Sequence, residues 1–291
     1  MKTKLPEVCV VMPVYNGAKT IEMTIKSLIF QTYSNWNCVI VNDGSTDETK
    51  NILDKIKDKR FKIIHLEKNK GRGYARQVCL ENASGDYLSY LDADDLYHPE
   101  KTAIQVEMFR NFPNIQLVTS GIGSYDNKFD LKTIRGLKNA GFKHFNKGDK
   151  IDFVPATSMI LIEKALKISY NNRLNASEDV DYFSNYLENC DYYITNKVLY
   201  YYYEFESVKY FKTIQYAFNS LKRIYYLRNK IKFSVFLSQM FVVLFKMLFY
   251  VFFYFILGKR YFVNRRGLVP NNSQISDFES ILSKINKDTF Q

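Results

Sequence analysis

The chain has 291 residues, of which 46% are hydrophobic and 24% are charged, with only 12 glycines and 6 prolines. This composition supports a sizeable buried core and excludes a mainly disordered, collagen-like or linker-dominated chain. The net charge of +11 comes from residues 207–276, which hold 12 Lys and Arg, no acidic residue and the longest apolar run, and this combination indicates a membrane surface and not nucleic acid as the partner.

Short apolar runs alternate with amphipathic segments in the first third of the chain. The predicted strands lie at 8–12, 37–41, 61–66 and 87–91. The predicted helices lie at 21–31, 46–57 and 73–81, where apolar residues recur at helical spacing. Apolar strands that alternate with such helices predict a parallel sheet covered on both faces, in which ligands bind at the carboxyl ends of the strands.

The second half of the chain changes character after Glu206. A further strand is predicted at 152–162, and a helix at 177–188 carries three acids in its first turn, where they favour the helix N-terminus. Residues 208–232 are amphipathic and basic, and 233–257 form a nearly uninterrupted apolar stretch. We therefore expect two units, which are a catalytic domain over residues 1–206 and a helical membrane-associating region over residues 207–291.

The cysteines and the N-terminus indicate a reducing, cytoplasmic setting. No two of the four cysteines form a C-x-x-C pair, and the nearest two, Cys9 and Cys38, are 29 residues apart. A zinc site is therefore not expected, and the thiols are expected to behave as small buried hydrophobes. The first four residues lack the apolar region of a signal peptide.

An acidic turn follows the predicted strand 87–91. Asp92, Asp94 and Asp95 place three carboxylates within four residues, and they stay ionised together most readily around a cation. Mg²⁺ and Mn²⁺ prefer oxygen ligands and often share them with substrate phosphates. The alternative is a solvated acidic turn, but the position after a strand of a parallel sheet favours a metal site.

Two further polar segments are candidates for substrate binding. Asp43 follows a predicted strand, where it either accepts hydrogen bonds from a ribose or base edge or forms a turn that caps a helix. Gly71 and Gly73 suggest a dinucleotide-binding loop, but Arg76 stands where the third glycine belongs, so that interpretation is rejected. Arg76 is instead a candidate partner for a phosphate or for the nearby carboxylate of Asp92.

Taken in order, these motifs resemble the inverting family 2 glycosyltransferases, which have a GT-A fold, over roughly residues 7–207. The matching blocks are PVYN at 13–16, QT at 31–32, DGSTD at 43–47, NKGRGYAR at 69–76, ASGDY at 83–87, LDADD at 91–95, PATSMILI at 155–162 and ED at 178–179. The resemblance implies transfer of one hexosyl or N-acetylhexosaminyl group from a nucleotide-sugar, with Mn²⁺ or Mg²⁺ as the cofactor. The Gln-x-x-Arg-Trp motif of processive synthases is absent, which favours a single transfer over polymerisation.

The resemblance also implies roles for individual residues. The residues at the nucleotide would be Pro13, Tyr15, Asp43, Arg76 and Asp92, and the uracil contact expected of Asp43 favours UDP. Asp94 would bind the metal that bridges the diphosphate, where positive charge stabilises the leaving group. Asp179 would be the catalytic base that takes the proton of the acceptor hydroxyl, and its alternative role is that of a helix-capping acid.

A second metal ligand is expected at Glu204. Many relatives carry a histidine three residues before a serine near the end of this domain, and that histidine sometimes binds the metal. Counting back from Ser207 places Glu204 at this position, with a surface glutamate as the alternative. One other departure concerns Gln77, which stands where the family often has asparagine and affects a minor contact only.

The apolar stretch 233–257 is long enough to span a bilayer. Basic residues flank both of its ends, however, so a span would place one basic cluster outside, against the positive-inside tendency. We therefore expect a monotopic helix or hairpin in the cytoplasmic leaflet of the cell membrane, in contact with anionic lipids. A buried or dimeric helical subdomain and a true span stay open, as does a homo-oligomer.

A membrane-attached transferase suggests a lipid-linked glycan acceptor, as in the assembly of bacterial surface polysaccharides. This step rests on analogy with the family. The alternatives are transfer to a lipid or a protein, or a catalytically silent membrane scaffold that binds nucleotide-sugars. Joint retention of Asp43, Asp92, Asp94 and Asp179 disfavours the silent scaffold.

Overall fold

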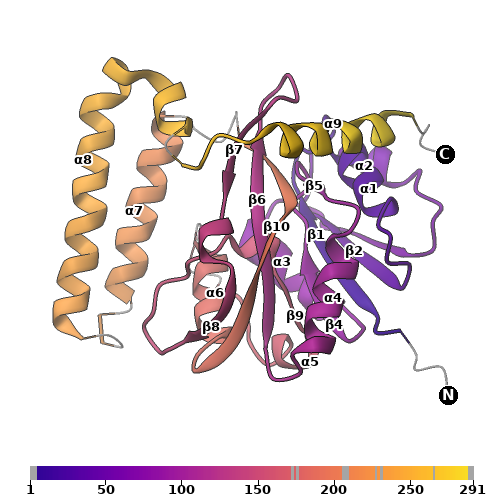
Figure 1. Cartoon of the computed structure of the whole chain (residues 1–291), viewed down its shortest axis with the longest axis horizontal. Helices are drawn as coiled ribbons and strands as arrows, with labels where there is room; N and C mark the ends of the chain where they lie inside the picture. The colour runs from indigo at the N-terminus through magenta and orange to yellow at the C-terminus, as the bar shows by residue number, and fades with distance from the viewer. Residues whose placement is uncertain are drawn as a thin grey trace.

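The protein, represented by a computed structural model, is described over residues 5–171, 174, 177–204, 210–226, 228–229, 232–264 and 266–287. Within these residues a ten-stranded sheet has the order β3-β2-β1-β4-β9-β6-β10-β5, with β7 beside β6 and β8 beside β10 (Figure 1). The strands are β1 (Val8–Val14), β2 (Trp36–Asn42), β3 (Phe61–His65), β4 (Tyr87–Tyr90), β5 (Leu96–Tyr97), β6 (Leu117–Tyr125), β7 (Leu131–Arg135), β8 (Gly141–Phe145), β9 (Met159–Leu161) and β10 (Cys190–Tyr203). The helices are α1 (Ile21–Ile29), α2 (Thr49–Leu53), α3 (Arg72–Glu81), α4 (Lys101–Asn111), α5 (Ile162–Ala165), α6 (Glu178–Tyr186), α7 (Tyr210–Tyr226), α8 (Phe233–Asn264) and α9 (Asn272–Lys287), with 3-10 turns η1 (Leu137–Asn139) and η2 (Pro155–Thr157).

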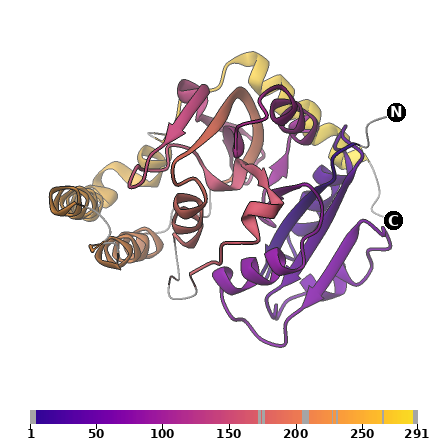
Figure 2. The ribbon, with the colours of Figure 1, turned by 90° about the horizontal axis from the view of Figure 1, so that it is seen from below.

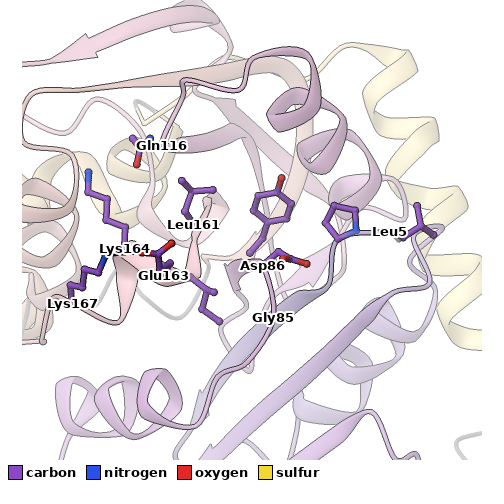
Figure 3. A pocket seen from close by; sticks show the side chains of 11 residues that line it. Leu5, Gly85, Asp86, Gln116, Leu161, Glu163, Lys164 and Lys167 are labelled. Atoms are coloured by element: carbon purple, nitrogen blue, oxygen red, sulfur yellow. Dashed lines mark hydrogen bonds and ion pairs between the residues drawn. The ribbon is translucent and has the colours of Figure 1, made fainter. Parts of the chain in front are cut away.

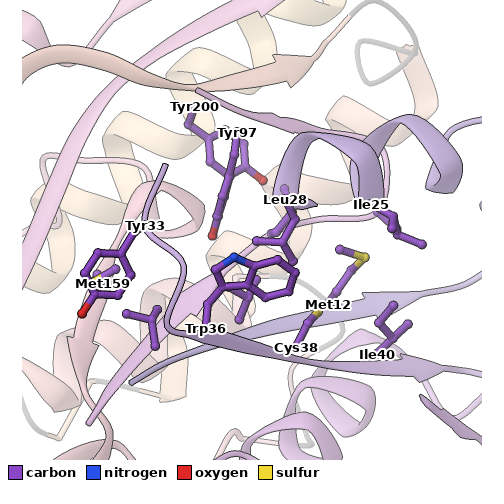
Figure 4. Close-up of a cluster of buried hydrophobic side chains, with 14 of the residues drawn as sticks. Met12, Ile25, Leu28, Tyr33, Trp36, Cys38, Ile40, Tyr97, Met159 and Tyr200 are labelled. Carbon is purple, nitrogen blue, oxygen red and sulfur yellow. The ribbon is translucent and has the colours of Figure 1, made fainter. Parts of the chain in front are cut away.

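The first half of the sheet is parallel and covered on both faces, as the sequence predicts. β1 pairs in parallel with β2 and with β4, and β2 pairs in parallel with β3. Alternate residues of β1 enter two different cores, with Met12 beside α1 and Val11 beside α3. Figure 4 shows the first of these cores, in which Met12, Ile25 and Leu28 pack with Trp36 of β2. The carboxyl ends of β1, β2 and β4 therefore meet at one edge of the sheet.

Two predicted elements are shorter in the structure than in the sequence analysis. The predicted strand 152–162 contains η2, only three residues of β9 and the start of α5. Pro155 has no N–H to donate to a neighbouring strand, so it does not fit inside a central β-strand. It stands instead at the first position of η2. The predicted helix 46–57 is reduced to the five residues of α2.

The residues before α2 are held in a different arrangement, which explains its short length. The side-chain oxygen of Asn16 accepts a hydrogen bond from the backbone N–H of Thr46 at 2.8 Å, and the Ser45 hydroxyl accepts one from the N–H of Asn16 at 2.9 Å. These contacts tie the loop after β2 to the loop after β1, so residues 45 and 46 do not enter the helix. The same contacts hold two site-forming loops together.

Three of the four cysteines are buried as the sequence predicts, whereas Cys190 is half-buried. Cys9, Cys38 and Cys79 are buried, and all four thiols are free. Burial raises the pKa of the Cys9 thiol to about 12, so this thiol stays protonated at neutral pH.

Helices α7 and α8 form a helical hairpin that stands beside the sheet, and they lie next to each other in both views (Figures 1 and 2). The ring of Tyr210 at the start of α7 packs on Tyr254 of α8 at a centroid distance of 5.1 Å. The segment Phe233–Gly258 has a mean hydropathy of 2.4 and meets the length and composition of a membrane-crossing helix. Its large side chains face outward, and Phe255 is 77% exposed. The hairpin is therefore not buried within the described part of this chain.

The chain returns from the hairpin to the sheet. The backbone of Leu268 pairs with Ile134 of β7 through two hydrogen bonds of 2.8 Å. Helix α9 then buries Phe278 and Ile281 in a cluster with Tyr201 of β10. Residues 266–287 thus pack on the sheet, whereas the expected boundary between residues 206 and 207 lies outside the described residues.

Candidate active site

The predicted site residues follow the carboxyl ends of β1, β2 and β4. Tyr15 is exposed just after β1, Asp43 is buried just after β2, and Asp92 follows β4 by two residues. Asp179 comes from the first turn of α6, far along the chain, and lies within reach of the same group of side chains. The structure therefore brings Arg76, Asp92 and Asp179 together, and it places Glu204 in a different environment.

Asp43 fixes the loop that leads into α3. Its two carboxylate oxygens accept hydrogen bonds from the backbone N–H groups of Lys70 and Gly71, at 2.8 and 2.9 Å. Gly44 has a φ of +64°, and a Cβ there would lie 2.4 Å from the backbone of Lys68, so this turn needs glycine. Asp43 thus positions the loop in front of Arg76, and its predicted contact with a nucleobase or ribose stays a prediction.

Arg76 is the centre of the candidate site. Its guanidinium contacts the carboxylates of Asp92 at 3.1 Å, Glu178 at 2.9 Å and Asp179 at 3.8 Å. Burial by itself lowers the pKa of Arg76, but the three carboxylates outweigh it and hold the pKa well above the usual range. The arginine therefore stays charged and connects the turn after β4 to the first turn of α6.

The three aspartates of the acidic turn have different surroundings. Asp95 is fully buried and accepts hydrogen bonds from the Tyr200 hydroxyl at 2.7 Å and from the Tyr203 backbone N–H at 2.9 Å. Burial, together with the neighbouring carboxylates, raises the pKa of Asp95 well above its usual range. Asp92 is paired with Arg76, whereas the side chain of Asp94 is exposed. Asp94 is therefore the carboxylate of this turn that faces solvent.

This arrangement fits a divalent cation that is shared with substrate. In the part of the chain that the structure describes, no group of three or more His, Cys, Asp or Glu side chains is arranged to hold a metal. Mg²⁺ commonly binds through one or two carboxylates plus substrate phosphates, and not in a cage made by protein alone. An exposed Asp94 next to an ion-paired Asp92 matches that donor set.

Asp179 stands at the start of α6, after a residue in an unusual conformation. Ser177 adopts a φ of +61°, and the next two residues, Glu178 and Asp179, begin the helix. The Glu178 side chain is buried against Arg76, whereas the Asp179 side chain is 30% exposed. Asp179 therefore lies near the buried guanidinium of Arg76 and is still accessible to a substrate, as a catalytic base must be.

Glu204 is buried between two arginines. Its side chain is 2% exposed, with Nη1 of Arg266 at 2.5 Å and Nη2 of Arg135 at 3.3 Å from its carboxylate oxygens. The alternative role as a surface glutamate is therefore wrong. Two guanidinium groups also repel any cation that approaches this carboxylate, so we leave Glu204 out of the metal set that we propose below.

Sequence reasoning missed several residues that shape the site. These are Tyr125, Glu178, Tyr200 and Tyr203, which hold the acidic turn or Arg76. The Tyr-rich stretch 200–203 was visible as a composition signal, but its strand and its register beside β6 come from long-range pairing. Its tyrosines become site residues only when β10 lies next to the turn after β4.

A cavity of about 750 Å³ lies at the opposite end of β4 (Figure 3). Its lining includes Asp86 just before the strand and Lys164 of α5. None of the predicted site residues lines it. The candidate site therefore lies at the carboxyl edge of the sheet and is separate from this cavity.

A mostly parallel sheet flanked by helices, with an acidic turn and a buried arginine at its carboxyl edge, defines the class of GT-A glycosyltransferases. The family model described as Glycosyl transferase family 2 matches residues 9–168, which is more than half of the chain. The chain belongs to this family.

Two curated relatives are similar to the first half of the chain. The putative teichuronic acid biosynthesis glycosyltransferase TuaG of Bacillus subtilis is 39% identical over 104 residues, which are 35% of this chain and 41% of TuaG. The Escherichia coli protein WfgD, a UDP-Glc:alpha-D-GlcNAc-diphosphoundecaprenol beta-1,3-glucosyltransferase, is 37% identical over 101 residues, 35% of this chain and 40% of WfgD. The matched segment thus spans about two fifths of either relative.

Two solved structures share the fold. S. aureus TarS 1-349 in complex with UDP-GlcNAc has a TM-score of 0.59 and 20% identity, over 82% of this chain and 71% of that TarS 1-349 chain. The mannosyltransferase PcManGT from Pyrobaculum calidifontis, in complex with GDP-Man and Mn²⁺, has a TM-score of 0.61 and 14% identity, over 99% of this chain and 77% of PcManGT. At these identities the likeness establishes the fold alone.

We expect Glu178→Gln to lower the free energy of unfolding by about 1.5–3 kcal/mol, because it removes a buried, charge-assisted hydrogen bond to Arg76. The matched control is Glu188→Gln, which breaks a surface pair with Lys147 and should cost less than about 1 kcal/mol. Urea denaturation of both variants measures the difference. Equal losses would contradict the central place of the Glu178–Arg76 pair.

Proposed function

We propose that this protein is an inverting, metal-dependent transferase that moves one sugar from a UDP-sugar to a glycan acceptor, which is lipid-linked, in surface polysaccharide biosynthesis. The observation that carries the proposal is the position of Arg76, whose guanidinium contacts Asp92 of the acidic turn and Asp179 of α6 within 3.8 Å. Asp92, which we expect at the sugar donor, and Asp179, which we expect at the sugar acceptor, thus contact the same guanidinium group.

The names of the relatives support the choice of substrates. WfgD is named for a UDP-Glc donor and a diphosphoundecaprenol-linked acceptor, and TuaG is named for teichuronic acid biosynthesis. The TarS structure holds UDP-GlcNAc, and the PcManGT structure holds Mn²⁺ with a nucleotide-sugar. For this chain, the sugar, the acceptor and the metal are proposals.

The proposed mechanism follows from the site residues. Asp43 holds the loop before α3 and thereby places Arg76. Asp94 would hold Mn²⁺ or Mg²⁺, which stabilises negative charge on the departing diphosphate. Asp179 takes the proton of the acceptor hydroxyl as that oxygen attacks the anomeric carbon. One in-line displacement inverts the anomeric centre, so no covalent enzyme intermediate is needed.

The Arg76 cluster prepares the site for this chemistry. Arg76 neutralises part of the charge of Asp92, Glu178 and Asp179, yet three carboxylates face one guanidinium. The excess negative charge favours a bound divalent cation at the exposed Asp94. Arg76 also keeps a fixed positive charge 3.8 Å from one carboxylate oxygen of Asp179, while the other oxygen accepts the backbone N–H of Val180 at 2.7 Å, and these two contacts orient the proposed base.

We further propose that the helical hairpin α7–α8 lies in the cytoplasmic leaflet of the cell membrane. The apolar part of α8 is about 38 Å long at 1.5 Å per residue, and most of its phenylalanines are exposed. Basic residues lie at both ends of this segment, so a monotopic position keeps both near anionic headgroups. The hairpin would then be the membrane unit, and residues 266–287 would belong to the catalytic domain.

Three basic side chains at the end of the hairpin where α7 connects to α8, Lys222, Arg228 and Lys232, provide a test of the membrane proposal. Each contributes about 1 kcal/mol near an anionic leaflet, so changing all three to Gln should weaken vesicle binding roughly 100-fold at low salt. The control changes Lys55, Lys57 and Lys59, exposed residues after α2, and should alter binding little.

Vesicle flotation with phosphatidylglycerol measures these affinities. High salt should reduce but not abolish the binding of the parent, because the apolar term does not depend on salt. A parent chain that stays fully soluble at low salt without detergent would contradict the monotopic proposal and favour a dimeric helical subdomain. Protease access to the hairpin from the outer face of sealed vesicles would favour a span.

A thermal-stability screen of nucleotide-sugars tests the donor proposal. A ligand at 100 times its dissociation constant adds about 2.7 kcal/mol to the free energy of unfolding. We expect UDP-sugars to raise the melting temperature in Mn²⁺ more than in chelator, and GDP-sugars to raise it less. Stabilisation by no nucleotide-sugar would contradict donor binding, and stabilisation without any turnover would favour a silent scaffold.

A further inference from the structure

An arginine cluster, made of Arg135, Glu204 and Arg266, lies where the helical hairpin joins the catalytic domain. Glu204 is the last described residue before α7, and Arg266 is the first described residue after α8. Arg266 contacts Glu204 at 2.5 Å, and Arg135 at the end of β7 contacts it at 3.3 Å. Both ends of the proposed membrane unit therefore meet at this cluster.

The arginine cluster carries an excess positive charge and is partly exposed to solvent. Two guanidinium groups face one buried carboxylate, which leaves one positive charge. The side chains of Arg266 and Arg135 are 37% and 22% exposed, so the cluster is open to solvent on one side. Guanidinium groups match the geometry of phosphate oxygens, so this charge suits a phosphate-bearing ligand.

One tyrosine connects the arginine cluster to the proposed metal turn. The Tyr125 hydroxyl donates to the backbone oxygen of Asp94 at 3.2 Å, and the Tyr125 carbonyl accepts from the N–H of Glu204 at 3.3 Å. Arg135 also donates to the hydroxyl of Ser124 at 3.1 Å. The cluster is thus a short distance from the place where the donor diphosphate would sit, and the hairpin base is on its other side.

We propose that the arginine cluster binds the diphosphate of a lipid-linked acceptor at the membrane surface. The proposal rests on the proposed function, since it needs an acceptor whose sugar is joined to a lipid through a diphosphate. Such an acceptor brings a second anion close to the donor diphosphate and the acidic turn, so it requires its own cation. Arg135 and Arg266 supply that charge between the membrane unit and the catalytic residues.

Farnesyl diphosphate is a suitable probe, because it joins an isoprenoid chain to a diphosphate and carries no sugar. We would titrate it into the full chain in dodecyl maltoside micelles, with UDP and Mn²⁺ saturating the donor site. We expect Arg266→Gln and Arg135→Gln to bind it roughly 10- to 100-fold more weakly, because each loses a charge-assisted contact. Lys284→Gln on α9 removes one exposed positive charge from a residue outside the arginine cluster and the hairpin, and it should leave the affinity unchanged.

Glu204→Gln separates a binding site from a purely structural ion pair. It removes the carboxylate that competes for both arginines, so we expect several-fold tighter binding of farnesyl diphosphate and unchanged Mn²⁺-dependent binding of UDP. A structural ion pair predicts lower stability with no gain in affinity. Arg266→Lys keeps the positive charge beside Glu204 but loses the planar guanidinium, which can donate two parallel hydrogen bonds. This variant should therefore bind farnesyl diphosphate three- to tenfold more weakly, and it tests the site even if Arg266→Gln folds poorly.

Further arms identify the source of the phosphate. Inorganic pyrophosphate should show the same order of variants, whereas phosphatidylglycerol in mixed micelles should not. The same losses with phosphatidylglycerol would overturn the acceptor site in favour of a general headgroup contact. Unchanged affinity in folded Arg135→Gln and Arg266→Lys would also overturn it. A parent that binds farnesyl diphosphate but no UDP would contradict the proposed function and leave this inference standing.

Discussion

Asp179→Asn should lower the rate of sugar transfer by about 10²–10⁴ and leave the binding of UDP and Mn²⁺ in place. The amide keeps the shape of the side chain but cannot take the proton of the acceptor hydroxyl. Nucleotide binding should survive, because Arg76 keeps its closer contacts with Asp92 and Glu178. Single-turnover transfer and UDP titration measure the two effects separately.

Asp181→Asn is the matched control for this substitution. Asp181 lies in the same first turn of α6 and undergoes the same chemical change, but it makes no contact with Arg76 among the described interactions. It should retain nearly full activity. Loss of UDP binding together with turnover in Asp179→Asn would assign Asp179 to the structure of the site instead of to catalysis.

Asp94→Ala should abolish Mn²⁺-dependent binding of UDP and lower transfer by about 10³ or more. The metal contributes several kcal/mol of charge stabilisation as the diphosphate leaves, and Asp94 is the exposed carboxylate of the turn that would hold it. Asp95 cannot replace it, because Asp95 is buried and bonded to Tyr200 and Tyr203. Calorimetric titration of UDP with Mn²⁺ or with chelator measures the effect.

Asp130→Ala is the control for nonspecific loss of a surface carboxylate. Asp130 is exposed and pairs with Lys132 beside β7, so its removal should change neither UDP binding nor transfer. If Asp94→Ala were as active as the parent and both were insensitive to chelator, the proposed metal role would be wrong.

The first half of the fold could be predicted because its signals are local. Alternate residues of β1 fill two cores, and α1 and α3 bury one face each. The spacing of apolar residues along the sequence is therefore enough to predict strands and helices that form a parallel sheet. The acidic turn and Asp43 follow strand ends, and neighbouring parallel strands bring these ends together without further information.

The second half could not be predicted, because its contacts join distant segments. Arg76 meets Glu178 across 102 residues, and Arg266 meets Glu204 across 62 residues. The spacing of residues within either segment does not predict such long-range ion pairs. Strands β6 and β10 are also unusual, since Tyr and Thr in them are buried, which weakens the alternation that a sequence reader seeks.

The return of the chain at α9 was missed for a similar reason. Its apolar residues Phe278, Ile281 and Ile285 have helical spacing, but they follow a long basic and apolar region that dominates the composition of the C-terminus. Only the pairing of Leu268 with Ile134 directs the chain back to the sheet. Composition alone therefore groups α9 with the hairpin, whereas the packing groups it with the catalytic domain.

The most direct test of the account is the release of UDP from a panel of UDP-sugars by the purified full chain, measured in Mn²⁺ and in chelator. The account predicts that at least one UDP-sugar is turned over in Mn²⁺, that chelator abolishes the turnover, and that an added lipid-linked glycan accelerates it. Equal rates with and without metal, or no turnover of any UDP-sugar while another nucleotide-sugar is consumed, would contradict it.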